Sequence, residues 1–212
     1  MAKIKYLPHA YYPYHITARC INKDWFRIPI DEVWGIMSNY LFFLKHGFGF
    51  EIINFVLMEN HFHLIARTPE ANLSQGMNYF MRETSRSIAN VSGRINQTYG
   101  APYHWSLIKN MTYYQHAYKY VYRNPIEAGL TFRVEDYAYS TLQTKLGLAK
   151  SIIPVTEDFL LFESVENSLL WLNTSYPDQE SKLLIKSALK KREFKFAKDK
   201  HGKPVYLDSQ II

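Results

Sequence analysis

Segments with the hydrophobic period of a strand and segments with that of a helix follow each other in a definite order up to Pro125. This order constrains the fold more than any other feature of the chain. Apolar side chains alternate in some segments, as in strands, and recur every three or four residues in others, as in helices. The expected strands are 12–19, 50–58, 61–67 and 103–109, and the expected helices are 31–47, 72–91 and 112–123. This order predicts an α+β class: a ferredoxin-like split β-α-β fold with an antiparallel four-stranded sheet and one extra helix.

Local signals support the second helix. Asn72-Leu73-Ser74-Gln75 resembles a capping box, in which the first and last side chains would satisfy free backbone groups. The apolar face expected after it consists of Met77, Phe80, Met81, Thr84, Ile88 and Val91. We therefore expect one side of this helix to be buried.

The residue pattern of the sequence changes after Tyr137. Two more helices are expected at 158–172 and 181–192. The second carries Lys182, Lys186, Lys190, Lys191 and Arg192, and the basic run continues through Lys195, Lys198, Lys200 and Lys203. We place a soft boundary near Lys150, between a catalytic domain at 1–150 and a mostly helical basic extension at 151–212. Such a charge run is usually a solvated face, but it could equally track phosphates.

Charge and aromatic content favour a polyanionic partner. The 212-residue chain has 25 Lys and Arg against 19 Asp and Glu, a net charge of +6 and an isoelectric point of about 9.2. Basic side chains that neutralise phosphates release counterions from nucleic acid. Aromatic residues make up 16%; they suit base stacking, although a core would use them equally.

Membrane and secreted classes are not expected. No apolar run approaches the ~18 residues of a membrane span, and the N-terminus does not resemble a signal peptide. The single cysteine, Cys20, cannot form an intramolecular disulfide, which fits a reducing compartment. We therefore expect a cytoplasmic protein without a membrane partner.

The tripeptide His61-Phe62-His63 carries the clearest chemical signal. Residues two apart on a strand project from one face, so two imidazoles would emerge side by side and could bind a divalent metal. A His-apolar-His pair is common by chance and is weak by itself. On the first expected strand, His15 and Arg19 share the polar face, and we interpret His15 as a hydrogen-bonded core histidine.

A second signal lies at the end of the helix expected at 112–123. Tyr120 and Asn124 are one helical turn apart, at the edge of the apolar face, whereas Tyr118 and Tyr122 are better explained by packing. Arg123 is expected to face outward. Asn124 has a rival interpretation as the N-cap of a new helix that starts at Pro125.

Together these residues resemble a known family. The segments Met58-Glu59-Asn60-His61-Phe62-His63-Leu64 and Tyr120-x-Tyr122-x-Asn124-Pro125-x-x-Ala128-Gly129-Leu130 are similar to the REP-associated tyrosine transposases, which belong to the single-tyrosine HUH transposases. Tyr14-His15-Ile16-Thr17-x-Arg19 and Asp136-Tyr137-x-Tyr139-Ser140 also match. The resemblance spans roughly residues 10–142. The sequence departs from the family at Tyr103-His104-Trp105-Ser106, where many relatives carry Gln-x-Arg.

The resemblance implies an endonuclease that nicks and rejoins single-stranded DNA, often beside a hairpin, in DNA transposition and recombination. It makes Tyr120 the nucleophile, which would form a 5′-phosphotyrosine, and it makes His61, His63 and Asn124 the ligands of a metal. Two imidazoles and an amide oxygen point to Mg²⁺ or Mn²⁺, although zinc could occupy such a site. The cation would stabilise charge on the scissile phosphate.

Other basic and aromatic residues are candidates for contacts with DNA, as a set rather than individually. They are Arg19, Arg67, Arg82, Arg86, Lys109 and Arg123, with Tyr103 and Trp105 as stacking platforms. Two other functions stay open: a metal-dependent phosphodiesterase without a covalent intermediate, and a single-stranded nucleic-acid-binding module. A monomer and a homodimer are both compatible with the sequence.

Overall fold

Four antiparallel strands form one sheet at the centre of the computed structural model, which describes residues 8–93, 95, 97–157 and 164–196. The strands are β1 (Tyr14–Arg19), β2 (Glu51–Met58), β3 (His61–Arg67) and β4 (His104–Leu107), in the spatial order β2-β3-β1-β4. All three pairings are antiparallel. This is the ferredoxin-like arrangement, so the expected fold class is confirmed.

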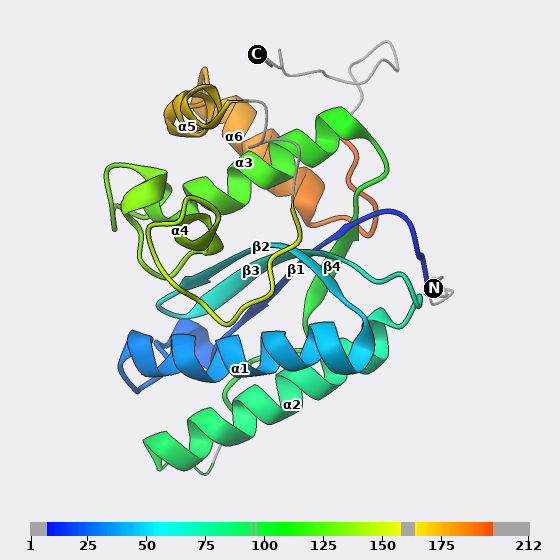
Figure 1. Ribbon diagram of the computed structural model, residues 1–212, viewed down its shortest axis with the longest axis vertical. Coiled ribbons are helices and arrows are strands. Elements are labelled where there is room, and N and C mark those ends of the chain that lie inside the picture. The colour runs from blue at the N-terminus through cyan, green and yellow to red at the C-terminus, as the bar shows by residue number, and fades with distance from the viewer. Residues whose placement is uncertain (1–7, 94, 96, 158–163, 197–212) are drawn as a thin grey trace.

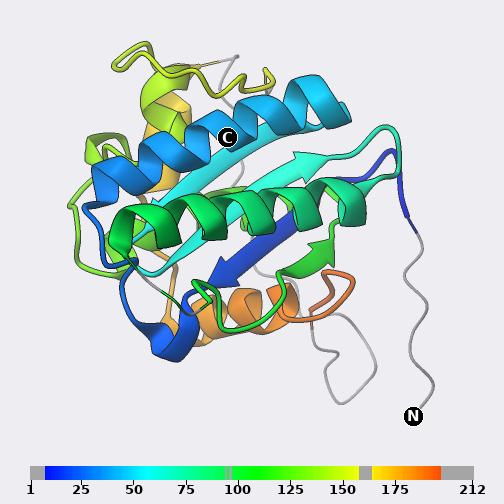
Figure 2. The same ribbon diagram turned by 90° about the horizontal axis from the view of Figure 1, so that it is seen from below.

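Helices α1 (Ile30–Phe48) and α2 (Leu73–Ser92) cover one face of the sheet (Figure 1). The view from below shows them side by side across the strands (Figure 2). Tyr14, Ile16 and Ala18 alternate along β1 and are buried against this layer. A glycine is needed at position 76 of α2, because a Cβ atom there would lie 2.4 Å from the ring of Phe50.

The other face carries α3 (Met111–Glu127) and the two C-terminal helices, α5 (Val165–Asn173) and α6 (Gln179–Leu189) (Figure 1). Val56 and Ile65 of the sheet share one buried cluster with Val121 of α3, Leu172 of α5 and Ile185 of α6. The described part of the C-terminal region is therefore packed into the core on this face. Smaller elements are η1 (Ile21–Lys23), η2 (Val134–Asp136) and α4 (Thr141–Lys145).

Several element boundaries differ from the sequence-based expectation. The first strand begins at Tyr14 rather than residue 12, and the fourth is confined to His104–Leu107. In α2, Val91 is 55% exposed, so its assignment to the apolar face is wrong. Asn72 precedes α2 but makes no side-chain capping bond. Its Nδ2 donates to the Phe48 carbonyl 2.9 Å away, and its Oδ1, the atom that would accept in a cap, has no partner among the described residues.

The C-terminal boundaries also differ. The helix expected at 158–172 corresponds to α5, and residues 158–163 lie outside the described part of the chain. Helix α6 begins two residues early, where the Asp178 side chain accepts a hydrogen bond from the Ser181 amide, and it ends at Leu189. Lys198, Lys200 and Lys203 lie outside the described residues. None of the helices described is long and apolar enough to cross a membrane.

Candidate active site

The histidine pair lies on β3 and faces the layer that contains α3. Arg19, at the end of β1, is directly opposite His61, and Thr17 is opposite His63. Ile65 continues the same face of β3 into the core that it shares with α3. The period of two along the strand thus places both imidazoles on one face, as the sequence predicts.

His63 is held from the neighbouring strand by His15. The Nε2 atom of His15 and the Nδ1 atom of His63 are hydrogen-bonded at 2.9 Å, and the two rings stack with centroids 5.2 Å apart. Both residues are buried, at 2% and 5% exposure. The interpretation of His15 as a hydrogen-bonded core histidine is therefore confirmed. The Nε2 atom of His63 is buried and has no hydrogen-bond partner among the described residues.

His61 is oriented by the preceding residue. Its Nδ1 atom lies 2.8 Å from Oδ1 of Asn60, and Arg19 donates to the same oxygen over 3.3 Å. An amide oxygen only accepts, so the Nδ1 atom carries the proton and the Nε2 atom of His61 keeps its lone pair. Asn60 thus presets the tautomer that binds a metal through Nε2.

Tyr120 comes to the same place from α3. Its ring packs edge to face against His63, with centroids 5.6 Å apart, and against His15 at 6.3 Å. Tyr118 and Tyr122 are fully buried in the α3 core, which confirms their interpretation as packing residues. Residues far apart in the sequence, on β1, β3 and α3, therefore meet at one point.

Asn124 lies one turn after Tyr120 within the same helix. Helix α3 continues to Glu127 with Pro125 inside it, so the alternative in which Asn124 caps a new helix is wrong. Packing of the buried residues Val121 and Pro125 overrides the local preference of proline for a helix start. The Nδ2 atom of Asn124 donates to the Tyr120 carbonyl over 2.7 Å.

Burial keeps these side chains neutral. Desolvation lowers the pKa of His15 and of His61 to about 3, and lowers that of His63 well below its ordinary value. Burial also raises the pKa of Tyr120, while the charge of Arg19 and a hydrogen bond from Asn124 act in the opposite direction. The phenol is therefore protonated at neutral pH, with Arg19 placed to stabilise its anion.

The nitrogen and oxygen donor atoms of these residues fit a divalent cation in part. No three His, Cys, Asp or Glu side chains in the described part of the chain are placed to hold a metal. An ion here would depend on the two imidazoles, the Asn124 oxygen and oxygens of water or phosphate. The buried, unpartnered Nε2 of His63 and the preset tautomer of His61 suit such a ligand role.

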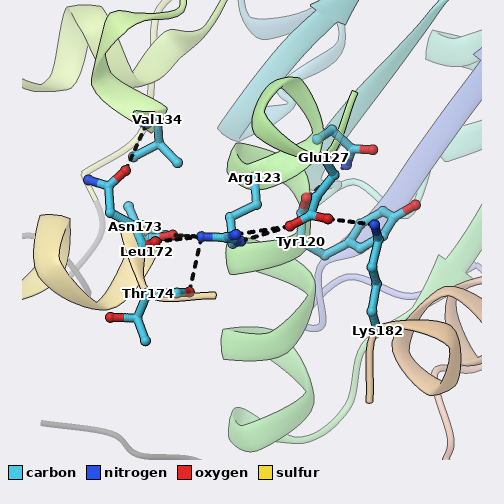
Figure 3. Close-up of polar contacts among 9 residues, drawn as sticks. Tyr120, Arg123, Glu127, Val134, Leu172, Asn173, Thr174 and Lys182 are labelled. Atoms are coloured by element: carbon cyan, nitrogen blue, oxygen red, sulfur yellow. Dashed lines mark hydrogen bonds and ion pairs between the residues drawn. The ribbon is translucent and has the colours of Figure 1, made fainter. Parts of the chain in front are cut away.

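Arg123 does not face outward, so that expectation is wrong. Its side chain is 4% exposed, because α5 covers it. The Nη1 atom donates to the carbonyls of Leu172, Asn173 and Thr174 at the end of α5, and Nη2 pairs with Glu127 over 2.9 Å (Figure 3). Arg123 thus joins two helices.

Of the other predicted DNA contacts, Arg19 lies opposite His61, and the rest do not gather at the histidines. Arg82 and Arg86 belong to α2, on the opposite face of the sheet, and both pair with Glu83. Arg67 lies about 20 Å along β3 from His61, by strand geometry. The other predicted residues contact neighbours within the protein. Arg67 forms an ion pair with Glu51, and Lys109 forms one with Glu193. The Tyr103 hydroxyl donates a hydrogen bond to Ser74, and the Arg192 guanidinium lies over the Trp105 ring.

The sequence analysis missed the role of Asn60 and did not predict the position of Lys186 near the site. Asn60 stands within the quoted His61 motif, but its role in fixing the His61 tautomer depends on a turn that the sequence does not specify. Lys186 of α6 acts electrostatically on both His61 and His63. It comes from a helix distant in sequence, and no local pattern signals its position.

Comparison with solved structures defines the class of fold. The chain is similar to a REP-associated tyrosine transposase whose structure was solved bound to a REP hairpin, with a TM-score of 0.57 and 20% sequence identity. The match covers 74% of this chain and 93% of that one. The fold is therefore that of a tyrosine transposase. A comparison with curated proteins gives no significant match.

The sequence itself identifies the family. The profile of the IS200-like transposases matches residues 11–124, which extend from β1 to Asn124 in the last turns of α3. The chain belongs to the IS200-like transposase family. The expected resemblance is thereby confirmed, and α5 and α6 lie beyond the matched residues.

Proposed function

We propose that this protein nicks and rejoins single-stranded DNA beside a hairpin, through a transient covalent bond between Tyr120 and a 5′ phosphate. The observation that carries the proposal is the packing of the Tyr120 ring against His63, whose buried Nε2 lacks a partner among the described residues. Membership of the IS200-like transposase family and the fold of the hairpin-bound relative support it. Hairpin DNA is thus the proposed partner.

The proposed chemistry exchanges one phosphate ester for another. The Tyr120 oxygen attacks phosphorus, the bond from phosphorus to the 3′ oxygen breaks, and a proton passes from the phenol to that oxygen. The tyrosine ester conserves the bond energy, so a 3′ hydroxyl can reverse the step and rejoin a strand. Arg19 stabilises the anion that develops on the phenol, since its charge opposes the rise in the pKa of Tyr120 that burial causes.

His61, His63 and Asn124 would hold Mg²⁺ or Mn²⁺ in this proposal. When bound, the cation supplies positive charge for the non-bridging oxygens of the scissile phosphate. Asn60 and His15 keep the two imidazoles in place through the hydrogen bonds described above. Imidazole ligands favour Mn²⁺ over Mg²⁺, which prefers oxygen ligands.

The test incubates the protein with a labelled single-stranded oligonucleotide that contains a hairpin, with Mg²⁺ or Mn²⁺. We expect a protein–DNA adduct that survives a denaturing gel, and we expect Tyr120→Phe to remove it. Tyr118→Phe is a matched control, because Tyr118 is buried in the α3 core. Cleavage without an adduct, retained by Tyr120→Phe, would instead show a phosphodiesterase that uses water.

A further inference from the structure

Helix α6 lies beside α3 on the histidine face of the sheet and is attached at both ends. At its start, the Nζ atom of Lys182 pairs with Glu127 of α3 (Figure 3). At its end, the Nε2 atom of His104 on β4 donates to the Leu189 carbonyl over 3.0 Å. Lys186 is between these attachments, one turn after Lys182 on the same side of the helix.

The attachments of α6 bring Lys186 to the candidate site. His104 is opposite Thr17 on β1, and Thr17 is opposite His63 on β3. The charge of Lys186 also acts to lower the pKa of His61 and of His63, as the charge of Arg19 does from β1. Two cations from different elements thus act on the same pair of neutral rings. Lys190, one turn further along, lies beyond the end of α6 and beyond its attachment to His104.

Neither of these two cations is paired with a carboxylate among the described residues. Lys186 is exposed and forms no ion pair in that part of the chain, and Arg19 donates to the neutral Asn60 amide. Glu127, the nearby carboxylate of α3, is already paired with Arg123 and Lys182. The candidate site therefore has an excess of positive charge that an anionic ligand would neutralise.

We propose that Lys186 binds a phosphate of the single-stranded DNA next to the scissile one, so that α6 forms part of the DNA-binding surface. The inference deepens the proposed function and rests on it. Helix α6 is outside the residues matched by the family profile, which end at Asn124. The C-terminal region would then act in DNA binding through a specific lysine beside the active site.

The test measures the affinity of a fluorescent hairpin oligonucleotide with a single-stranded tail, by anisotropy, in EDTA and between 50 and 200 mM salt. All variants carry Tyr120→Phe to prevent cleavage. We expect Lys186→Gln to weaken binding about fivefold and to reduce the salt slope by about 0.7, the value for one phosphate contact on a single strand. Lys186→Arg, which keeps the charge, and Lys190→Gln should stay within about twofold of the parent.

Two results would overturn the inference: an unchanged affinity and slope for Lys186→Gln, or an equal loss for Lys190→Gln. Melting temperatures should not change in either variant, because both lysines are exposed. The adduct assay with the unmodified chain separates this inference from the proposed function. Without an adduct the cleavage proposal fails, and the binding comparison still decides the role of Lys186.

Discussion

The Nε2 atom of His15 on β1 is 2.9 Å from the Nδ1 atom of His63 on β3, and both rings are buried beside Tyr120. This hydrogen bond joins β1 and β3 at the position where His63 faces α3. If Nδ1 of His63 donates its proton to His15, the Nε2 atom of His63 presents a lone pair. His15 is thus a positioning residue for the proposed ligand.

Replacing His15 should therefore weaken metal binding. We expect His15→Ala to lower the affinity for Mn²⁺ by 10- to 100-fold, roughly the usual effect of losing a hydrogen bond to a metal-bound histidine. It should also destabilise the fold by about 2–4 kcal/mol, because it leaves a cavity. His15→Gln, whose side-chain oxygen can accept from Nδ1, should lose less affinity. Calorimetric titration of all three proteins tests this, and equal affinities would contradict it.

Asn124 offers a second test of the ligand set. We expect Asn124→Ala to reduce the Mn²⁺ affinity about tenfold, because the loss of a metal ligand, or of a group that holds a ligand in place, has an effect of this size. The helix should persist, since α3 runs through this position and its packing residues are unchanged. Circular dichroism checks the helix, and an unaltered metal affinity would remove Asn124 from the ligand set.

The buried histidines predict loss of stability in acid. In the folded chain, the pKa values of His15 and His61 are lowered to about 3, whereas in the unfolded chain they are near 6.5. The unfolded state therefore binds more protons between these values, so stability is complete above pH 6.5 and falls as the pH decreases toward 3. Each fully buried histidine contributes up to about 1.4 kcal/mol per pH unit in this window. Urea unfolding from pH 7.5 to 4.5 measures the effect, and a constant free energy of unfolding would contradict it.

Arg123 and Arg19 should behave oppositely on substitution. Arg123→Ala removes the donor to three carbonyls at the end of α5 and should destabilise the protein by about 2–4 kcal/mol. Arg19→Ala removes an exposed side chain and should leave stability nearly unchanged while weakening DNA binding. Thermal melts and anisotropy, measured on both variants, test the pair. A destabilised Arg19 variant with normal DNA binding would reverse the assignment.

Much of this arrangement was predictable because its signals are local. The alternation in β1 and β3 places His15, His61 and His63 on one face, and the order of elements makes the two strands neighbours. The helical period places Tyr120 at the edge of the α3 core. These features depend on residues a few positions apart and on a topology that the order of elements restricts.

The errors concern contacts between distant segments. The outward orientation expected for Arg123 failed because α5 packs over it, through carbonyls about fifty positions further along the chain. The alternative in which Asn124 caps a new helix failed because tertiary packing keeps Pro125 within α3. Lys186 was expected only as one member of a basic run, because its place beside the histidines depends on how α6 docks.

The chemical identity of the nucleophile is the most direct test of the account. Trypsin cleaves after Lys119 and Arg123, so Tyr118 separates from the peptide 120–123, which contains Tyr120 and Tyr122. We expect mass spectrometry of the nuclease-trimmed adduct to find the nucleotide on peptide 120–123, and fragmentation to place it on Tyr120. A nucleotide on any other residue would contradict the central claim that Tyr120 attacks the DNA.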